Sequence, residues 1–427
     1  MRGENTLITF LISTIKIIFL LGFLIFIHES GHFLVAKACK IRVKEFAIGF
    51  GPTIWKKQGK ETKYALRLIP LGGFVNMIGE AERSDEEGSF SKASIPKRIA
   101  VVVAGGAVNI IFGLLVYFTV ASTSGNYIST TIDEVVPNYA AEQVGIQSND
   151  ELLEIDGKRV RLKSDIDEKV QNSNGEPITL TIKRDNELKD IILTPTVVET
   201  KNIGIYLGAE ENDLSGEIKS IYAGSPAEKA GIMAGDIIVS INGENPKGDP
   251  YKIVELISKS ETNEIILEIQ RNNEIIIFNI VHQIQTTYKM GVTFKVAENT
   301  FANNIYYGFW DTIDFSLSLL DNLKMMFTGN VSADQLMGPV GISQVVSKTQ
   351  GLVEFLYMLA LISLSLGVTN LLPFPPLDGG KVVILLIEAV RRKPIKENVE
   401  IAIQMAGFFL MIGLSIYVTY KDVLRIF

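Results

Sequence analysis

The chain has 427 residues, of which 47% are apolar and 21% are charged, with a formal net charge of −7 at pH 7 and a single cysteine. This length predicts two or more folded units, and the negative charge argues against a nucleic-acid partner, which would need a basic face. One cysteine excludes an internal disulfide and a cysteine-based metal cage.

The first long apolar run extends from about Phe10 to Ala36. It exceeds the roughly 20 residues that a helix needs to span a bilayer. A cleavable signal peptide is excluded, because the run is too long, lacks a small-residue cleavage site and continues through the charged sequence HESGH. Lys16 lies near one end of the run, where its ammonium group can reach the membrane surface. We therefore expect a membrane-spanning helix.

This run contains the pattern H-E-x-x-H, from His28 to His32. Two histidines four residues apart share one face of a helix, so both imidazoles can bind one metal ion. Glu29 lies beside them and can accept a proton from a water that the metal activates. The alternative is a hydrogen-bonded pair inside a helix bundle. Because ionisable groups at membrane depth are costly, and two of the chain's three histidines are here, the pattern favours a metal site.

A second apolar run covers about Arg98 to Ser122. The loop before it, from Lys37 to Arg98, carries 13 Lys/Arg against 7 Asp/Glu. A later loop, which follows the third apolar run, is also basic and holds Arg391, Arg392, Lys393 and Lys396. An excess of Lys and Arg marks cytoplasmic loops. We therefore expect both termini, and the long stretch from about 123 to 350, outside the cytoplasm.

The middle of the chain contains an internal repeat. Ile132–Gly157 aligns without a gap with Ile218–Gly243, at an offset of 86 residues. Each copy alternates short β-branched strands with Gly/Asn/Asp turns and one Ala-rich helix. Both copies resemble PDZ domains, which bind a chain end by strand addition and hold its carboxylate on backbone amides. In the second copy that loop is Gly204–Gly208, whereas the first copy shows no counterpart. Alternatively, both copies only guard an entrance.

Three further elements follow the repeat. The segment Phe301–Phe327 is interrupted by four charged residues and predicts an amphipathic helix on the outer membrane surface. Apolar runs at about Leu352–Leu372 and Val399–Val418 predict the third and fourth membrane spans.

The third span continues without a polar break into the sequence NLLPFPPLDGG, which ends at Gly380. Its prolines forbid a regular helix, and irregular backbone at membrane depth is tolerated only where it is buried in protein or lines a cavity. A catalytic zinc has three protein ligands and a water. Asp378 is the best candidate for the third ligand, and a helix N-cap at the cytoplasmic edge is the alternative.

Five motifs occur in order along the chain: FxHExGHF, IPLGGFV, a glycine four residues before Asn109, MGPVGI and NxxPxPPLDGG. Together they resemble the site-2 protease family, and two PDZ copies point to its regulator-of-sigma-E protease branch. The sequence departs from the family pattern at Gly106, where a proline is frequent, at Lys381, where a histidine is frequent, and at Lys16 in the first span.

This resemblance implies that His28, His32 and Asp378 bind zinc and that Glu29 is the general base. It also implies that the hairpin from Phe46 to Val75 re-enters the membrane, and that Gly105–Asn109 lies near the site. The implied substrate-binding residues are Asn370 and Asn109, together with Gly204 and Gly208 of the second PDZ-like unit.

The expected fold is a multi-pass α-helical membrane protein with four transmembrane helices, the first carrying HExxH, and two inserted α+β PDZ-like domains. The expected divisions are residues 7–122 (first membrane half), 123–205 and 206–290 (PDZ-like domains), 291–350 (amphipathic surface segment) and 351–427 (second membrane half).

The expected function is zinc-dependent endoproteolysis of single-span membrane proteins, such as anti-sigma factors or signal-peptide remnants. We expect a monomer in contact with lipid in the bacterial inner membrane, with the active site toward the cytoplasm and the PDZ-like domains outside. The alternatives are a proteolytically inactive PDZ scaffold and a metal transporter, although a transporter would need more ligands within the membrane.

Overall fold

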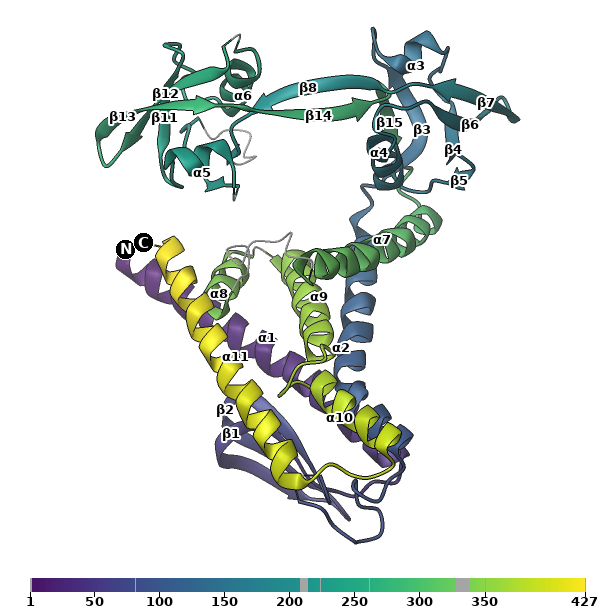
Figure 1. Cartoon of the computed structure of the whole chain (residues 1–427), viewed down its shortest axis with the longest axis vertical. Coiled ribbons are helices and arrows are strands. Elements are labelled where there is room, and N and C mark those ends of the chain that lie inside the picture. Colours follow the sequence, from purple (N-terminus) through teal and green to yellow (C-terminus); the bar gives the residue numbers. More distant parts are fainter. Residues whose placement is uncertain are drawn as a thin grey trace. The chain divides into compact units, whose positions relative to one another are not determined.

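The computed structural model describes residues 2–80, 82–207, 214–222, 224–260, 262–327, 338–349 and 351–426. The chain forms two compact units, Met1–Ser124 with Asn304–Phe427, and Gly125–Asn303. Figure 1 traces both units in the colours of the sequence.

Four helices of the first unit are long and apolar enough to cross a membrane, counted over the described residues. They are α1 (Arg2–Ala38), α2 (Ile95–Ser124), α9 (Gly351–Asn370) and α11 (Glu397–Ile426). Each overlaps an expected apolar run, although α1 begins about eight residues before its run and α11 ends about eight residues after its own. The four-helix expectation is therefore confirmed by length and composition.

Helix α2 lies between α1 and α9, and small residues set its distance from both. A Cβ on Gly31 of α1 would lie 2.5 Å from the carbonyl oxygen of Ala104, and one on Gly367 of α9 would lie 2.6 Å from that of Gly106. Side chains larger than hydrogen would push the helices apart at both points. Such close approach over small residues is how helices associate in lipid, where burial of apolar groups gives no driving force between them.

The basic loop after α1 folds into the antiparallel hairpin β1 (Val43–Gln58) and β2 (Lys63–Met77). Phe46, Val75 and Met77 are buried in a core that also contains Ala36 of α1 and Val101 of α2. The predicted hairpin is thus present and packs against the helices. Its re-entry into the membrane stays a prediction.

The remaining helices of the first unit are α7 (Phe301–Phe327), α8 (Pro339–Lys348) and α10 (Asp378–Arg391). Helix α7 packs on the end of α2: Phe315 stacks on Tyr117 at 4.3 Å between ring centroids, and the Tyr117 hydroxyl donates to Asp311 at 3.1 Å. The helical prediction for this segment is therefore confirmed, and its place on a membrane surface is untested.

Helix α10 is anchored at its C-terminal half by a buried carboxylate. Glu388 is 3% exposed and accepts hydrogen bonds from Arg98 of α2 at 2.9 Å and from the backbone N–H of Ile395 at 2.8 Å. Charge-assisted bonds of this kind are strong when buried. They fix α10 against the start of α2.

The second unit contains two hydrophobic cores of related construction. Around the first are β3 (Ile128–Val135), α3 (Ala140–Gln143), β4 (Glu151–Ile155), β5 (Lys158–Arg159), α4 (Lys163–Asn172), β6 (Ile178–Arg184) and β7 (Glu187–Leu193). Around the second are β9 (Ile205–Tyr206), β10 (Ser220–Ile221), α5 (Pro226–Ala230), β11 (Ile237–Ile241), α6 (Pro250–Ser258), β12 (Glu264–Arg271) and β13 (Glu274–Val281). Strands β8 (Thr196–Asn202) and β14 (Gln283–Lys289) pair with each other and connect the two.

The repeat extends to a matching ion pair in each copy. Arg184 bonds Asp150 at 2.7 Å and the carbonyl of Gly145 at 2.8 Å. Arg271 bonds Asp236 at 2.7 Å, and its second contact, at 2.9 Å, is the carbonyl of Gly231. Both aspartates are almost fully buried, so an equivalent buried ion pair stabilises each domain.

The expected domain boundaries need a correction, because the chain returns to the first domain after completing the second. Strand β15 (Val292–Val296) pairs with β3 and forms the edge of a six-stranded sheet ordered β15-β3-β4-β6-β7, with β5 beside β4. Residues 292–296 are therefore part of a folded domain and not of a surface segment. The second domain is inserted in the first, between β8 and β14.

This insertion also supplies the loop for which the sequence of the first copy shows no counterpart. The carbonyl of Ile203 accepts from the N–H of Ala227 in the second domain, at 2.9 Å, and Met290 takes the same place against Ala141 in the first. Gly291, at φ +82°, thus corresponds to Gly204, at φ +79°. The counterpart lies after the second copy in the sequence, outside the aligned repeat.

Candidate active site

His28 and His32 occupy successive turns of α1 and point the same way. Their Nε2 atoms are 3.2 Å apart, and their rings are nearly perpendicular. The side chains are 13% and 12% exposed. The four-residue spacing therefore places both imidazole nitrogens at one point, as the helix period requires.

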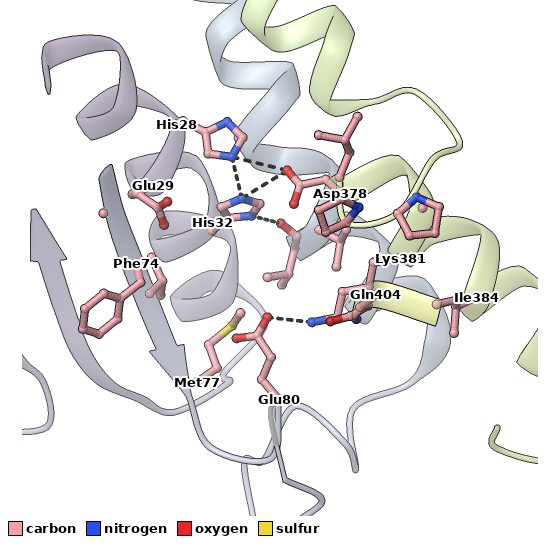
Figure 2. Close-up of a pocket in the computed structure, with 18 residues that line it drawn as sticks. His28, Glu29, His32, Phe74, Met77, Glu80, Asp378, Lys381, Ile384 and Gln404 are labelled. Carbon is pink, nitrogen blue, oxygen red and sulfur yellow. Dashed lines mark hydrogen bonds and ion pairs between the residues drawn. The ribbon is translucent and has the colours of Figure 1, made fainter. Parts of the chain in front are cut away.

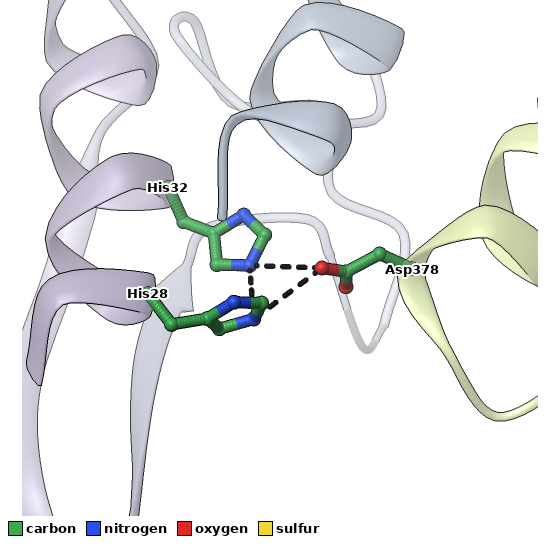
Figure 3. A group of neighbouring side chains, drawn as sticks. All are labelled: His28, His32 and Asp378. Carbon is green, nitrogen blue, oxygen red and sulfur yellow. Dashed lines mark hydrogen bonds and ion pairs between the residues drawn. The ribbon is translucent and has the colours of Figure 1, made fainter. Parts of the chain in front are cut away.

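Asp378 reaches this point from the other end of the chain. It is the first residue of α10, and its Oδ2 lies 3.3 Å from Nε2 of both histidines. Figure 3 shows the three side chains converging. The N-cap residue of α10 is Leu377, and no side-chain capping bond is present there. The ligand expectation for Asp378 is thus supported over the capping alternative.

Two glycines allow Asp378 to take this position. A Cβ on Gly379 would lie 2.2 Å from the carbonyl oxygens of Leu371 and Leu372, and one on Gly380 would lie 2.6 Å from the nitrogen of Pro375. The first turn of α10 therefore packs directly against the irregular, proline-rich backbone. This contact explains why the segment needs glycine after its aspartate.

The donor set fits zinc. Two imidazole nitrogens and one carboxylate oxygen lie within 4.8 Å of one another, and a catalytic zinc site has three such protein ligands and a position for water. The Oδ2 atom of Asp378 is buried, and beyond the two Nε2 atoms at 3.3 Å it has no hydrogen-bond partner among the described residues. A buried carboxylate oxygen that faces two imidazole lone pairs is costly unless a cation binds all three atoms, so the site is suited to a metal.

Glu29 lines the same cavity, which has a volume of about 280 Å³ (Figure 2). Space for its side chain is left by Gly73 of β2, whose Cβ would lie 3.0 Å from Cγ of Glu29. The strand β2 therefore forms one wall of the cavity, with Phe74 and Met77 also in its lining. The Glu29 carboxylate thus lines the same cavity as the candidate metal ligands and is not a member of that group.

Helix α2 contacts the two candidate metal ligands His28 and His32. The Nδ1 of His32 lies 2.8 Å from the carbonyl oxygen of Val101. A Cβ on Gly105 would lie 2.3 Å from Nε2 of His32 and 2.7 Å from Cε1 of His28, so no larger residue fits without a shift. Asn109 is fully buried, with Nδ2 placed 3.4 Å from Nδ1 of His28. The expected proximity of Gly105–Asn109 to the site is confirmed.

The cavity also contains an ion pair, Lys381–Glu80, that the sequence analysis did not predict. Lys381 lies one turn after Asp378 on α10, and its ammonium donates to Glu80 at 2.7 Å. A cation in the first turn of a helix is disfavoured by the helix dipole, so Glu80 compensates it. The signal was available in the three-residue spacing from Asp378, which places Lys381 on the cavity side of the helix. Figure 2 shows the pair beside Gln404 of α11.

The proposed substrate-binding residues are dispersed. Asn370 is the last residue of α9, is half-buried and does not line this cavity, and neither does Asn109. Gly204 lines a separate cavity of about 800 Å³ in the second unit, together with Ile203, Ile257 and Gln285. Gly208 lies outside the described residues.

The chain has close relatives over nearly its whole length. It is 30% identical to a regulator of sigma E protease from Haemophilus influenzae, over 98% of this chain and 100% of the relative. A relative from Clostridium perfringens that carries a zinc-metalloprotease name is 31% identical, over 94% of this chain and 95% of that one. The Salmonella typhimurium regulator of sigma-E protease RseP is 29% identical, with 95% and 97% covered.

Among solved structures, the chain resembles the HtrA3 PDZ domain bound to a phage-derived ligand. The identity is 23%, over 22% of this chain and 93% of that one, with a TM-score of 0.19. This likeness is too limited to carry an argument. The profile of peptidase family M50, in contrast, matches residues 16–414. The chain therefore belongs to peptidase family M50 and is a zinc metalloprotease of the site-2 type.

Proposed function

We propose that this protein hydrolyses peptide bonds of single-span membrane proteins within the membrane, using one zinc ion held by His28, His32 and Asp378. The observation that supports this most directly is that the three donors converge beside Glu29 in one cavity, and that both histidines and Glu29 are on α1, a helix able to span a bilayer. The M50 relationship supports the proposal.

Zinc in such a site acts as a Lewis acid toward a water and the scissile carbonyl. The protein's own part begins with Glu29, which takes a proton from the attacking water. The oxygen of that water forms the new bond to the carbonyl carbon, and the C–N bond breaks. Glu29 then returns the proton to the leaving amine. Because Glu29 lies in the cavity and is not a ligand, it is free to shuttle this proton.

The substrate must be locally extended, because a helix hides its carbonyls in its own hydrogen bonds. The edge of the β1–β2 hairpin forms a cavity wall and is suited to pair with such a strand. Gly73 and Phe74 of β2 line the cavity, which supports this role for the hairpin. Asn370 is a second proposed contact with the substrate backbone.

The two repeated domains are proposed to be PDZ-like. Two alternatives remain for them: a size filter that excludes substrates with bulky external domains, and capture of a chain end in the cavity beside Gly204. The edge position of β15 and the glycine at 291 make the first domain comparable in construction to the second.

The proposed setting is the bacterial inner membrane, with the site toward the cytoplasm and the repeated domains outside. The basic loops support this orientation. Proposed substrates are anti-sigma factors, which the relatives named as regulators of sigma E support, or signal-peptide remnants. The protein is proposed to act as a monomer.

The proposal is tested by incubating purified protein with a single-span reporter in liposomes and locating the cut by mass spectrometry. We expect cleavage inside the apolar segment that stops with a chelator and returns with zinc. An inactive scaffold would leave the reporter intact at every zinc concentration, and that result would refute the proposal.

A further inference from the structure

Three residues of α2 face the metal ligands, and they recur every four residues. Val101, Gly105 and Asn109 therefore share one side of the helix. Gly105 has no side chain and lets this face approach both imidazole rings. The residues on either side of it contact one histidine each: Val101 lies against His32, and Asn109 against His28.

The contact between α2 and His32 determines the tautomer of the ring. The carbonyl oxygen of Val101 can only accept a hydrogen bond, so Nδ1 of His32 must be the donor. The neutral ring therefore carries its proton on Nδ1 and leaves the lone pair of Nε2 facing Asp378 and His28. Metal-binding histidines usually have such an acceptor behind them, which fixes the ring and its tautomer.

His28 needs the same arrangement if its Nε2 is to bind metal, and Asn109 is the group beside its Nδ1. As placed, the amide nitrogen of Asn109 faces that atom at 3.4 Å, and Oδ1 is buried without a hydrogen-bond partner among the described residues. The two ends of an amide are distinguished only by their hydrogen bonds. Turning the amide by 180° lets Oδ1 accept from Nδ1–H.

We propose that Asn109 is a positioning residue for the metal, whose side-chain oxygen accepts a hydrogen bond from Nδ1–H of His28. The two histidines are then held by matching acceptors from one helix face, a backbone carbonyl for His32 and an amide oxygen for His28. This inference rests on the proposed metal site. It assigns Asn109 a role different from the substrate contact that the sequence suggested.

The fold holds Asn109 in place for this role. Its backbone carbonyl accepts a hydrogen bond from the hydroxyl of Ser363 on α9 at 2.8 Å, and both residues are fully buried. One turn before Asn109, Gly106 packs against Gly367 of α9. The amide therefore projects from a backbone fixed on the side opposite His28, and it is pre-oriented before metal binds.

The test measures zinc affinity of the purified full-length protein by competition with a chelator, alongside the absorption spectrum of the cobalt-loaded protein. Asn109→Leu keeps the size and removes the acceptor, and we expect its zinc affinity to fall about 10- to 100-fold. Asn109→Asp keeps an acceptor oxygen and should bind zinc within about threefold of the unaltered protein. The cobalt bands should shift in the leucine variant and not in the aspartate variant.

The matched control is Asn370→Leu, the same change at a residue outside the cavity. It should leave zinc affinity and the cobalt spectrum unchanged, whatever it does to cleavage. If Asn109→Leu fails to fold, the same zinc competition is measured with Asn109→Ala, which should show the same loss of affinity. Unchanged zinc binding with a raised KM in the Asn109 variant would overturn the inference and restore the substrate contact. Failure of the unaltered protein to bind zinc would instead refute the proposed metal site.

Discussion

The two units of this protein differ in how their key contacts are distributed along the sequence. In the first unit, the proposed zinc ligands His28 and Asp378 are 350 positions apart in the sequence and are brought together by close-packed glycines. In the second unit, a sequence repeat forms two domains of similar fold, and each domain contains its own buried Asp–Arg ion pair. We therefore expect the first unit to tolerate few substitutions at its close glycine contacts. The second unit distributes its stability over two similar hydrophobic cores.

This contrast predicts where substitutions will act. Substitutions at the proposed metal site should abolish activity and leave the fold largely intact. Ionisable side chains within a membrane helix bundle have an unfavourable free energy, so they do not stabilise the bundle. Changes in the repeated domains should alter stability or substrate choice and leave the chemistry intact.

The largest effect is expected for Glu29→Gln. Removing the general base should lower the cleavage rate by at least about 10²- to 10⁴-fold, while zinc stays bound, because Glu29 is not a ligand. Parallel metal analysis and reporter cleavage check both parts. Loss of most of the zinc from this variant would show that Glu29 has been assigned the wrong role.

Asp378→Asn should come next. The amide is a poorer metal ligand than a carboxylate, so zinc occupancy and activity should both fall sharply. A helix-capping residue would tolerate asparagine well. Full zinc content with full activity in the purified variant would therefore favour the capping alternative.

Gly105→Ala should disturb the site by crowding alone. The added methyl group would lie 2.3 Å from Nε2 of His32, so the ring or the helix must move, and zinc affinity should fall at least about tenfold. Gly413→Ala on α11 is the matched control, since nothing lies within 4 Å of its Cβ. It should be neutral or stabilise the helix by about 0.5–1 kcal/mol. Equal zinc affinity in both variants would contradict the close-packing account.

Removing the repeated domains should change substrate choice. Replacement of residues 125–303 by a short flexible linker removes the whole second unit, including β15, which a deletion limited to the repeat would leave unpaired. As a size filter, the unit excludes substrates with external domains, so its removal should let the enzyme cut them. The measurement compares cleavage of full-length and trimmed substrate. Slower cleavage of trimmed substrate, with full-length substrate still uncut, would favour chain-end capture.

The smallest effect is expected from Asp150→Asn. Burial raises the pKa of Asp150, but hydrogen bonds from Arg184 and from the N–H of Gln147 outweigh it, so the net pKa lies below its ordinary value. A carboxylate with a lowered pKa stabilises the fold above its unfolded pKa of about 3.9, and this stabilisation is lost as the pH falls through the folded value. At neutral pH the substitution should cost about 2 kcal/mol.

Hydrogen exchange of β6, measured between pH 3 and 7, checks this prediction. Exchange should be faster in the variant at neutral pH and should converge with that of the unaltered protein in acid. Asp185→Asn is the control, because Asp185 is exposed and its φ of +53° suits asparagine. An equal change in both variants would show that the buried pair is not responsible.

Much of this architecture follows from local patterns in the sequence. Four apolar runs predict the four helices, H-E-x-x-H predicts two ligands on one helix face, and the 86-residue offset predicts two related domains. The sequence also makes Asp378 a candidate ligand, because an acidic residue beside prolines at membrane depth needs a cation.

What the sequence could not supply are pairings between distant segments. Strand β15 pairs with β3 across the inserted second domain, and no periodicity within either strand encodes that partner. The contact of Asn109 with His28 depends on how closely α1 and α2 approach at their glycines. The Lys381–Glu80 pair depends on where the turn after β2 meets α10. Such contacts appear only once the backbones are placed.

The central claim, that His28, His32 and Asp378 bind one zinc for peptide hydrolysis, is tested most directly by X-ray absorption spectroscopy of the zinc-loaded, detergent-purified protein. The account predicts one zinc per chain with two imidazole nitrogens at about 2.0–2.1 Å and oxygen ligands at about 2.0–2.2 Å. Asp378→Asn should alter the oxygen shell and His28→Ala should remove one imidazole. A sulfur ligand, or spectra that neither substitution changes, would contradict it.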